Sequence, residues 1–341
     1  MTSRFVGLLA ALMTCLAAVS APAATPQAAP SDLEAQSKAL ERAANAVVGV
    51  QSLAVADARS NSTLGRVRQG SGVVIGADGL ILTIGYLILE ADQVQLLLDD
   101  GRNMPARVVG YDLATGFGLL QALAPLSIVA APLGVSRAVA AQDNLLVVSG
   151  QPAGQLSAAR MVSRRPFAGY WEYRIDDALF TAPARTDHSG AGLFNARGEL
   201  VGIGSLVVSN ASGSEAPPQA GNMFVPVDLL RPILAEMRSK GASAASQRAW
   251  MGISGVDQGG EVRVMRVAED SPAEAAGVQT GDRIMAIDGQ PVSTLDALWT
   301  LLWNGEPERD VRLEIERGAQ RQTLNVRTVD RNRQLRKASG V

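Results

Sequence analysis

Turn dipeptides set between short apolar runs are the feature that most limits how this chain can fold. Asp-Gly is the strongest of these signals, because both residues accept the positive φ angles of tight hairpin turns. Turn dipeptides recur through the first two thirds of the chain, at Asp78-Gly79, Asp100-Gly101 and Arg197-Gly198. Hairpins at such spacing are typical of β-sandwiches and β-barrels. The sequence therefore predicts a mainly β region over residues 47–240, closed by a helix over residues 228–240.

A smaller α+β region is predicted over residues 250–328. Its first short helix has Ser271 as the cap, Pro272 at the first position and Gly277 at the end. A second helix is expected to begin at Ser293, where a Ser-x-x-Asp capping box precedes an apolar stripe. That stripe consists of Leu295, Leu298, Trp299 and Leu302. At helical spacing these side chains share one face, which either packs into a core or lines a groove.

The N-terminus has the three parts of a secretory signal peptide, predicted over residues 1–23. Arg4 supplies the positive charge, residues 5–19 are apolar, and Ala21-Pro22-Ala23 places small residues around a cleavage site. The apolar run is shorter than the roughly 20 residues of a membrane-spanning helix. Cleavage is therefore the preferred interpretation, with an uncleaved anchor as the alternative. Cleavage would leave no integral membrane segment and a periplasmic or secreted protein.

Three further segments connect or flank these regions. Residues 24–46 are predicted as a leader followed by a helix, with Ser31 as its cap and an apolar pattern that continues to Val48. Residues 241–249 are a predicted linker. Residues 329–341 form a polar, basic tail that we expect to be solvated.

Composition excludes several classes of function. The formal net charge is −2, which lacks the basic footprint of a nucleic-acid-binding protein. Cys15 is the only cysteine and lies within the predicted signal peptide, and the chain has one histidine. The predicted mature chain therefore has no thiol chemistry and no ordinary set of metal ligands, and we expect no metal and no cofactor.

The segment TDHSGAG at residues 186–192 has the form of a loop that presents a nucleophilic serine, Ser189. A serine hydroxyl needs a general base within hydrogen-bond reach. The only histidine, His188, is adjacent in sequence, and adjacent side chains rarely converge on one point. The lysines lie outside the strand-rich segments, at Lys38, Lys240 and Lys337. A tyrosine, with a pKa of ~10, stays protonated at neutral pH. The chain therefore has no conventional triad.

Three long motifs give the chain a resemblance to a known family. They are GSGVVIGADGLILT, DGRNMPARVVGYD and SGAGLFNARGELVGI. With them, residues 47–234 resemble the trypsin-like protease domain of the HtrA/Deg family, and residues 250–328 resemble the PDZ domain that follows it in that family. The resemblance implies a mainly β fold: a trypsin-like double β-barrel with the active site in the cleft between barrels, followed by a smaller α+β PDZ domain.

The same motifs place the family's catalytic positions on this sequence. Tyr86 stands at the histidine position and Gly116 at the aspartate position, while Ser189 is retained. Asp187 stands where the family has a glycine whose backbone N–H belongs to the oxyanion hole, and a carboxylate there opposes the charge that the hole must stabilise. The resemblance therefore implies a catalytically degenerate member in which Ser189 is vestigial.

The resemblance also implies a peptide-binding site. Trp250, Met251, Gly252 and Ile253 match the PDZ loop whose backbone N–H groups hold a peptide's terminal carboxylate. The stripe Leu295, Leu298, Trp299 and Leu302 would form the opposite wall of the groove. The expected partners are C-terminal peptides of envelope proteins.

Three functions remain open from the sequence. The preferred one is an inactive HtrA/Deg-like scaffold or regulatory protein of periplasmic quality control, which binds peptide C-termini. The resemblance implies assembly as a trimer, or together with an active relative. The alternatives are a serine endopeptidase that uses a non-standard base or a base from a partner, and a holdase chaperone that binds unfolded chains in the barrel cleft.

Overall fold

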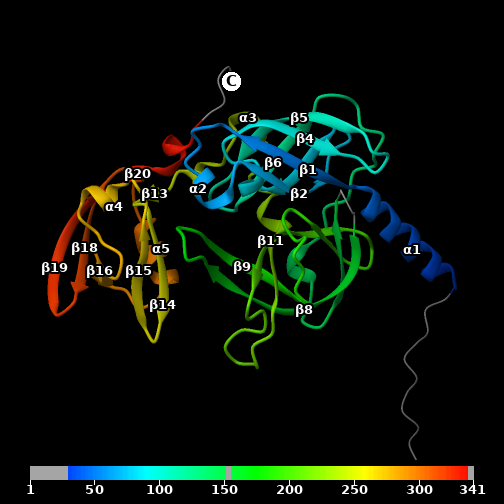
Figure 1. Cartoon of the computed structure of the whole chain (residues 1–341). Coiled ribbons are helices and arrows are strands. Elements are labelled where there is room, and N and C mark those ends of the chain that lie inside the picture. Colours follow the sequence, from blue (N-terminus) through cyan, green and yellow to red (C-terminus); the bar gives the residue numbers. More distant parts are fainter. Residues whose placement is uncertain (1–29, 151–154, 337–341) are drawn as a thin grey trace, which may run out of the picture.

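The computed structural model describes residues 30–150 and 155–336. The predicted signal peptide, residues 24–29 of the predicted leader and the last five residues of the predicted tail lie outside these ranges. Two β-barrels pack side by side, and a smaller unit adjoins them, coloured yellow to red in Figure 1. Within the described residues, no helix is long and apolar enough to cross a membrane.

The first barrel is a closed sheet with strand order β1-β2-β3-β6-β5-β4. Its strands are β1 (Val47–Ala54), β2 (Val67–Val74), β3 (Leu80–Ile84), β4 (Ala91–Leu97), β5 (Asn103–Tyr111) and β6 (Phe117–Ala122). The predicted Asp78-Gly79 and Asp100-Gly101 turns join β2 to β3 and β4 to β5, with Gly79 and Gly101 at positive φ.

The second barrel repeats this strand order, as β7-β8-β9-β12-β11-β10. Its strands are β7 (Asn144–Ser149), β8 (Gln155–Ala168), β9 (Arg174–Ala182), β10 (Gly192–Phe194), β11 (Leu200–Val208) and β12 (Gly221–Pro226). One apolar core contains buried side chains of both barrels, among them Phe117 and Phe194. The two barrels therefore pack against each other, and the loops at their interface contact both barrels. The predicted double barrel is confirmed.

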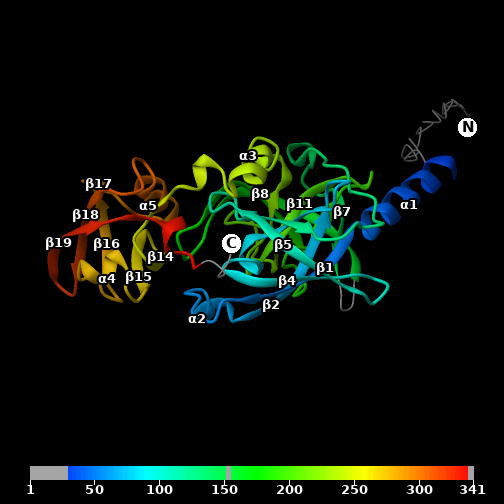
Figure 2. The ribbon, with the colours of Figure 1, turned by 90° about the horizontal axis from the view of Figure 1, so that it is seen from above.

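The helices around the barrels differ from the predicted ones at their ends. Helix α1 (Pro30–Asn45) projects away from the barrels in both ribbon views (Figures 1 and 2). It begins before Ser31 and ends before Val48, because Val47 and Val48 already pair with β2. Two short helices follow, α2 (Asn61–Leu64) and α3 (Leu234–Lys240).

The closing helix is also shorter than predicted, since residues 227–229 form a separate 3-10 turn before α3. Gly241 ends α3 in the left-handed conformation, at φ 84°. Further 3-10 turns occur at Gly85–Leu87, Ser136–Ala138, Ala244–Ser246 and Arg331–Gln334.

The smaller unit has its own sheet, with strand order β14-β15-β16-β18-β19. Its strands are β13 (Ala249–Trp250), β14 (Ile253–Gln258), β15 (Glu261–Val267), β16 (Arg283–Ile287), β17 (Gln290–Pro291), β18 (Asp310–Arg317), β19 (Gln320–Arg327) and β20 (Val329–Asp330). Helices α4 (Pro272–Ala275) and α5 (Leu295–Leu302) complete it. A separate apolar core centres on Trp299, which is 0% exposed. The predicted α+β unit is therefore confirmed.

Of the two helix caps predicted in the smaller unit, one needs correction. Ser271 caps α4 as expected, since its hydroxyl accepts from the backbone N–H of Glu274 at 3.2 Å. Helix α5, however, is capped by Thr294 rather than Ser293. The hydroxyl of Thr294 accepts from the N–H of Ala297 at 3.1 Å, because the extended backbone at Thr294 aims its side chain at the first turn.

The predicted tail is not simply solvated. Strand β20 pairs with β13, which places Asp330 opposite Ala249. The 3-10 turn after β20 then lies against the predicted linker, where Asn332 donates to the carbonyl of Ser246 at 2.8 Å. The reason is a pairing between segments far apart in the sequence, which the polar composition of the tail did not indicate: β20 supplies the second strand that β13 needs.

The predicted linker is also fixed in place. Ser243 and Ser246 are buried, and both hold the segment that follows β5. The backbone N–H and the hydroxyl of Ser243 donate to the Asp112 carboxylate, and the hydroxyl of Ser246 accepts from the N–H of Leu113 at 2.7 Å. The smaller unit is therefore attached to the first barrel by a buried, hydrogen-bonded connection.

Candidate active-site cleft and peptide-binding groove

Ser189 lies between the two barrels, on the loop that joins β9 to β10. Its backbone carbonyl accepts from the N–H of Ser71 in β2 at 2.8 Å. The next residue, Gly190, donates to the carbonyl of Gly204 in β11 at 2.9 Å. Gly190 has φ 73°, and a Cβ there would lie 2.0 Å from the carbonyl oxygen of Ser71, so only glycine fits. Both barrels thus hold the serine loop.

The side chain nearest to the serine hydroxyl is that of Tyr86, from the 3-10 turn after β3. Tyr86 Oη lies 2.8 Å from Ser189 Oγ and 2.8 Å from the carbonyl oxygen of Ser205. Since a carbonyl can only accept, the phenol hydroxyl donates its proton to the carbonyl of Ser205. The hydroxyl of Ser189 then donates to the phenol oxygen. Burial raises the pKa of Tyr86 to about 12, although the contact with Ser189 opposes this rise. The phenol is therefore neutral and a poor proton acceptor at neutral pH.

Gly116 lies behind Tyr86, and its surroundings leave no room for a side chain. Its carbonyl accepts from the N–H of Gly85 at 2.7 Å, which joins it to the turn that carries Tyr86. Gly116 has φ 80°, and a Cβ there would lie 2.9 Å from the hydroxyl oxygen of Tyr173. Tyr173 is buried and donates to the carbonyl of Thr115 at 3.0 Å. Sequence reasoning missed this residue, which fills the space beside the aspartate position.

Asp187 precedes the serine loop's tip and is neutralised by a neighbour. Arg185 Nε lies 2.9 Å from one carboxylate oxygen of Asp187, and the hydroxyl of Ser149 donates to the other. Burial raises the pKa of Asp187, but the hydrogen bonds from Arg185 and Ser149 outweigh it and hold the pKa below its ordinary value. The ring of His188 also turns to Arg185, with Nδ1 3.1 Å from its carbonyl oxygen. Burial lowers the pKa of His188.

The loop at Trp250–Ile253 binds a carboxylate, which belongs to Glu172. The backbone N–H groups of Met251, Gly252 and Ile253 lie 3.2, 2.8 and 3.2 Å from Glu172 Oε1. Gly252 has φ 88°, and a Cβ there would lie 2.3 Å from the Cβ of Ser271. Trp250 itself is half-buried in β13. Glu172 was not identified from the sequence, where its only signal is a charged residue within the aromatic run YWEY.

The apolar stripe of α5 serves mainly as core. Leu295, Leu298, Trp299 and Leu302 are all buried in the apolar cluster of the smaller unit. Trp299 also reaches the groove, because its indole N–H donates to the carbonyl of Gly169 at 3.0 Å. Helix α5 therefore packs into the apolar core of the smaller unit and makes one polar contact, with the carbonyl of Gly169.

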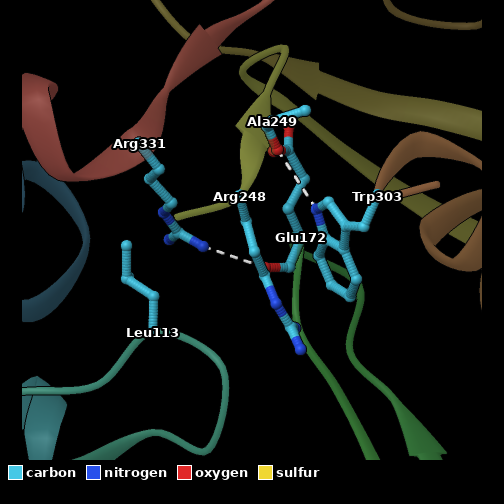
Figure 3. Close-up of a pocket in the computed structure, with 6 residues that line it drawn as sticks. All are labelled: Leu113, Glu172, Arg248, Ala249, Trp303 and Arg331. Carbon is cyan, nitrogen blue, oxygen red and sulfur yellow. Dashed lines mark hydrogen bonds between the residues drawn. The ribbon is translucent and has the colours of Figure 1, made fainter. Parts of the chain in front are cut away.

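Figure 3 shows the junction at which Glu172 enters the smaller unit from the second barrel. Arg331 Nη1 donates to the backbone carbonyl of Glu172 at 2.8 Å, and Trp303 Nε1 donates to that of Ala249 at 3.1 Å. The guanidinium of Arg248 lies over the Trp303 ring, 4.1 Å from its centroid. Within the described residues, no cluster of three or more histidine, cysteine, aspartate or glutamate side chains could hold a metal ion.

Comparison with known proteins identifies the same two units. Residues 70–203 match the trypsin-like peptidase domain family, and residues 249–328 match the PDZ domain family. Serine endoprotease DegS of Escherichia coli K12 is 30% identical over 295 residues, which cover 81% of each chain. The putative serine protease HhoA of Synechocystis is 28% identical, over 76% of this chain and 70% of its own.

A probable periplasmic serine endoprotease, DegP-like, of Pseudomonas putida is 26% identical, over 75% of this chain. The match spans about half of that relative's own length, 55%.

Solved structures share the fold. The HtrA-type protease AlgW with a bound decapeptide superimposes with a TM-score of 0.53 at 21% identity, over 87% of this chain and 98% of AlgW. A serine endoprotease from Yersinia pestis gives a TM-score of 0.53 at 23% identity, over 90% and 99% of the two chains. The extent and identity of the match to DegS, with a trypsin-like double barrel followed by a PDZ domain, show that the chain belongs to the HtrA/Deg family of serine endoproteases.

Proposed function

We propose that this chain is a catalytically inactive member of the HtrA/Deg family that binds the C-termini of other proteins through its PDZ domain. The observation that carries the proposal is the contact between Tyr86 and Ser189, where an active serine protease needs a general base. The DegP-like relative of Pseudomonas putida carries the name of a probable periplasmic endoprotease, and we place this chain in the periplasm or outside the cell. The barrels would act as a scaffold, alone, as a trimer, or beside an active relative.

The first support is the shortage of proton acceptors. Serine attack requires a base that takes the hydroxyl proton as the bond forms. A neutral phenol with a pKa near 12 holds its own proton and offers only a weakly basic oxygen. His188 faces Arg185 instead of Ser189. Two lysines are in ion pairs on helices outside the cleft, Lys38 with Glu34 and Lys240 with Glu236.

The second support is the loss of the parts around the base. With glycine at position 116, no carboxylate could orient an imidazole even if Tyr86 were replaced. The space for a carboxylate is filled by Tyr173. The carboxylate of Asp187, which is paired with Arg185, lies close to the serine loop and offers no donor where a tetrahedral oxyanion would need one. Three independent parts of the machinery therefore work against acyl transfer.

The third support concerns the binding function. Three successive backbone N–H groups of the PDZ loop converge on one carboxylate, that of Glu172. A peptide's terminal carboxylate is the same chemical group, and PDZ domains recognise it by this arrangement. In its family, AlgW has been solved with a bound decapeptide. The geometry thus supports a carboxylate-terminated peptide as the ligand class.

The experiment for inactivity is active-site labelling. The full chain, its Ser189→Ala variant and an active family member are incubated with a fluorophosphonate probe, and casein turnover is followed in parallel. We expect labelling and turnover only for the active relative. Labelling of the wild type that Ser189→Ala abolishes would overturn the proposal and show a serine endopeptidase with an unrecognised base.

The experiment for binding uses an array of decapeptides with free C-termini and the same peptides with amidated C-termini. We expect a subset with apolar C-terminal residues to bind, and amidation or Gly252→Glu to abolish binding. Gly259→Glu is the matched control, because Gly259 lies at a hairpin turn with open space around it. Binding that survives both amidation and Gly252→Glu would contradict a PDZ-type site.

A further inference from the structure

Four successive residues of the second barrel, Gly169 to Glu172, lie along the PDZ groove. We call this stretch, which joins β8 to β9, the occluding segment. Its backbone adds to the edge of β14 in an antiparallel sense: Trp171 pairs with Ser254, and the N–H of Gly255 donates to the carbonyl of Tyr170 at 2.6 Å. An extended peptide that binds a PDZ domain adds to the sheet edge in the same way.

The two walls of the groove both contact the occluding segment. On the helix side, the indole of Trp299 donates to the carbonyl of Gly169. At the closed end, the Glu172 side chain takes the N–H groups that would otherwise meet a terminal carboxylate. Glu172 is only 3% exposed, so its carboxylate is withdrawn from solvent. The segment therefore reproduces both the backbone pairing and the anionic end of a bound peptide.

Contacts on either side of the segment hold it in place. Arg331, from the turn after β20, donates to the carbonyl of Glu172. Arg174 forms an ion pair with Asp296 on α5, at 2.7 Å. The indole of Trp171 stacks on the ring of Tyr173, with centroids 5.5 Å apart and the planes 6° from parallel.

We infer that the occluding segment is a built-in ligand of the PDZ groove, which a peptide with a free C-terminus must displace in order to bind. This inference concerns the regulation of the groove and rests on the proposed function for the identity of the competing peptide. A tethered ligand acts at an effective concentration of the order of millimolar. The apparent Kd of any external peptide equals its intrinsic Kd divided by the fraction of molecules in which the groove is open, so a small open fraction weakens binding.

The segment is suited to release as well as to occlusion. It is anchored through a buried carboxylate. The hydrogen bonds from the N–H donors offset the free-energy cost of burying that charge, so the net stabilisation of the closed state is small. Tyr170, whose carbonyl makes the pairing contact with Gly255, is 60% exposed. A peptide that offers the same carboxylate at its end, with apolar side chains in addition, would compete for the same donors.

The test compares the full chain with its Glu172→Lys variant. Lysine replaces the acceptor with a cation that can only donate, so it cannot bind three N–H groups. The matched control is Glu215→Lys, which changes the charge equally on an exposed loop of the second barrel. The probe is a fluorescein-labelled peptide of residues 164–174 with an amidated end, and its Glu172→Gln counterpart serves as the control peptide.

We expect the probe to bind Glu172→Lys at least about tenfold more tightly than the wild type or Glu215→Lys, as measured by fluorescence anisotropy. The counterpart peptide should bind weakly throughout. Equal affinity of the probe for wild type and Glu172→Lys would overturn the inference.

Hydrogen exchange provides a second readout that does not depend on any probe. Backbone amides of residues 251–255 should exchange at least about tenfold more slowly in the wild type than in Glu172→Lys. Equal exchange in the two proteins would again overturn the inference, whether or not the probe binds.

The decapeptide array separates this inference from the proposed function. If the array binds wild type and Glu172→Lys equally, the groove is open and only the inference fails. If the probe binds Glu172→Lys but no free C-terminus does, the inference stands and the proposed function fails.

Discussion

At the scale of single residues, two tyrosine side chains determine the surroundings of Ser189 and Gly116. Tyr86 Oη lies within hydrogen-bond distance of both Ser189 Oγ and the carbonyl of Ser205. Tyr173 fills the space beside Gly116. Both tyrosines are neutral, since burial raises the pKa of Tyr173 as well, even though a contact with Ser205 opposes it. The two phenols thus satisfy the carbonyls of Ser205 and Thr115, which is the usual role of hydroxyl groups buried in a protein.

The Tyr86 contact should contribute to stability. Tyr86→Phe removes the phenol oxygen and leaves the carbonyl of Ser205 without that donor, which costs about 1–3 kcal/mol when the site stays dry. Equilibrium unfolding in urea measures the difference in the free energy of unfolding. Tyr170→Phe is the control, because Tyr170 is exposed, and should change stability little. Equal stability of wild type and Tyr86→Phe would show that the contact has no structural value.

Restoring a side chain at position 116 should be costly. Gly116→Ala incurs both the strain of φ 80° and a contact with Tyr173, whereas Gly101→Ala has the same φ of 80° and open space. The control should cost about 1 kcal/mol from strain, and Gly116→Ala about 1–3 kcal/mol more from overpacking. Thermal unfolding of both variants measures the difference. A similar loss in the two variants would mean that Tyr173 moves aside freely.

The carboxyl of Glu172 should make stability depend on pH. Burial raises the pKa of Glu172 to about 7, although Arg331 and the N–H groups of the PDZ loop oppose the rise. Because this pKa lies above that of an unfolded glutamate, the folded state binds the proton more tightly. The contribution to stability is thus fully present below about pH 4.5 and is lost as pH rises to about 7.

The measurement is the free energy of unfolding from pH 5 to pH 8 for wild type and Glu172→Gln. We expect the wild type to lose stability relative to the variant as pH rises, with no further change above pH 8. A constant difference would indicate that the N–H donors cancel the effect of burial.

At the scale of elements, local signals predicted the hairpins better than the helices. The dipeptides at Asp78-Gly79 and Asp100-Gly101 stand at observed turns, because positive φ is a property of the residue itself. The ends of α1 and α3 were wrong, since their limits depend on strand pairing and packing. β20 was missed, since two residues carry no period, and its partner β13 lies about eighty residues earlier.

The turn after β20 should help to keep the occluding segment in place. Arg331→Gln removes the guanidinium that donates to the Glu172 carbonyl. We expect amides of residues 251–255 to exchange several-fold faster in this variant, as measured by mass spectrometry. Arg333→Gln is the matched control, because Arg333 is 70% exposed and pairs with Glu308 away from the groove. Equal exchange rates of these amides in the two variants would show that the turn does not help to hold the occluding segment.

At the scale of the whole molecule, the order of domains followed from the sequence, but the way they meet did not. The double barrel and the PDZ fold were expected from motifs, and hydrogen bonds join Tyr86 to Ser189 and the turn that carries Tyr86 to Gly116. The contact of Glu172 with Gly252 joins residues 80 apart along the chain. No local pattern encodes such a contact, nor the hydrogen bonds by which the linker serines attach to the segment after β5.

The adjacency of Glu172 and Tyr173 has a consequence for communication across the protein. Neighbouring Cα atoms are held about 3.8 Å apart, so a peptide that displaces the Glu172 backbone by more than about twice this distance must move Tyr173 too. Withdrawal of that ring would remove the side chain that packs beside Gly116, whose carbonyl accepts from Gly85 in the turn that carries Tyr86. A peptide that binds the smaller unit would then change the packing around Ser189 between the barrels.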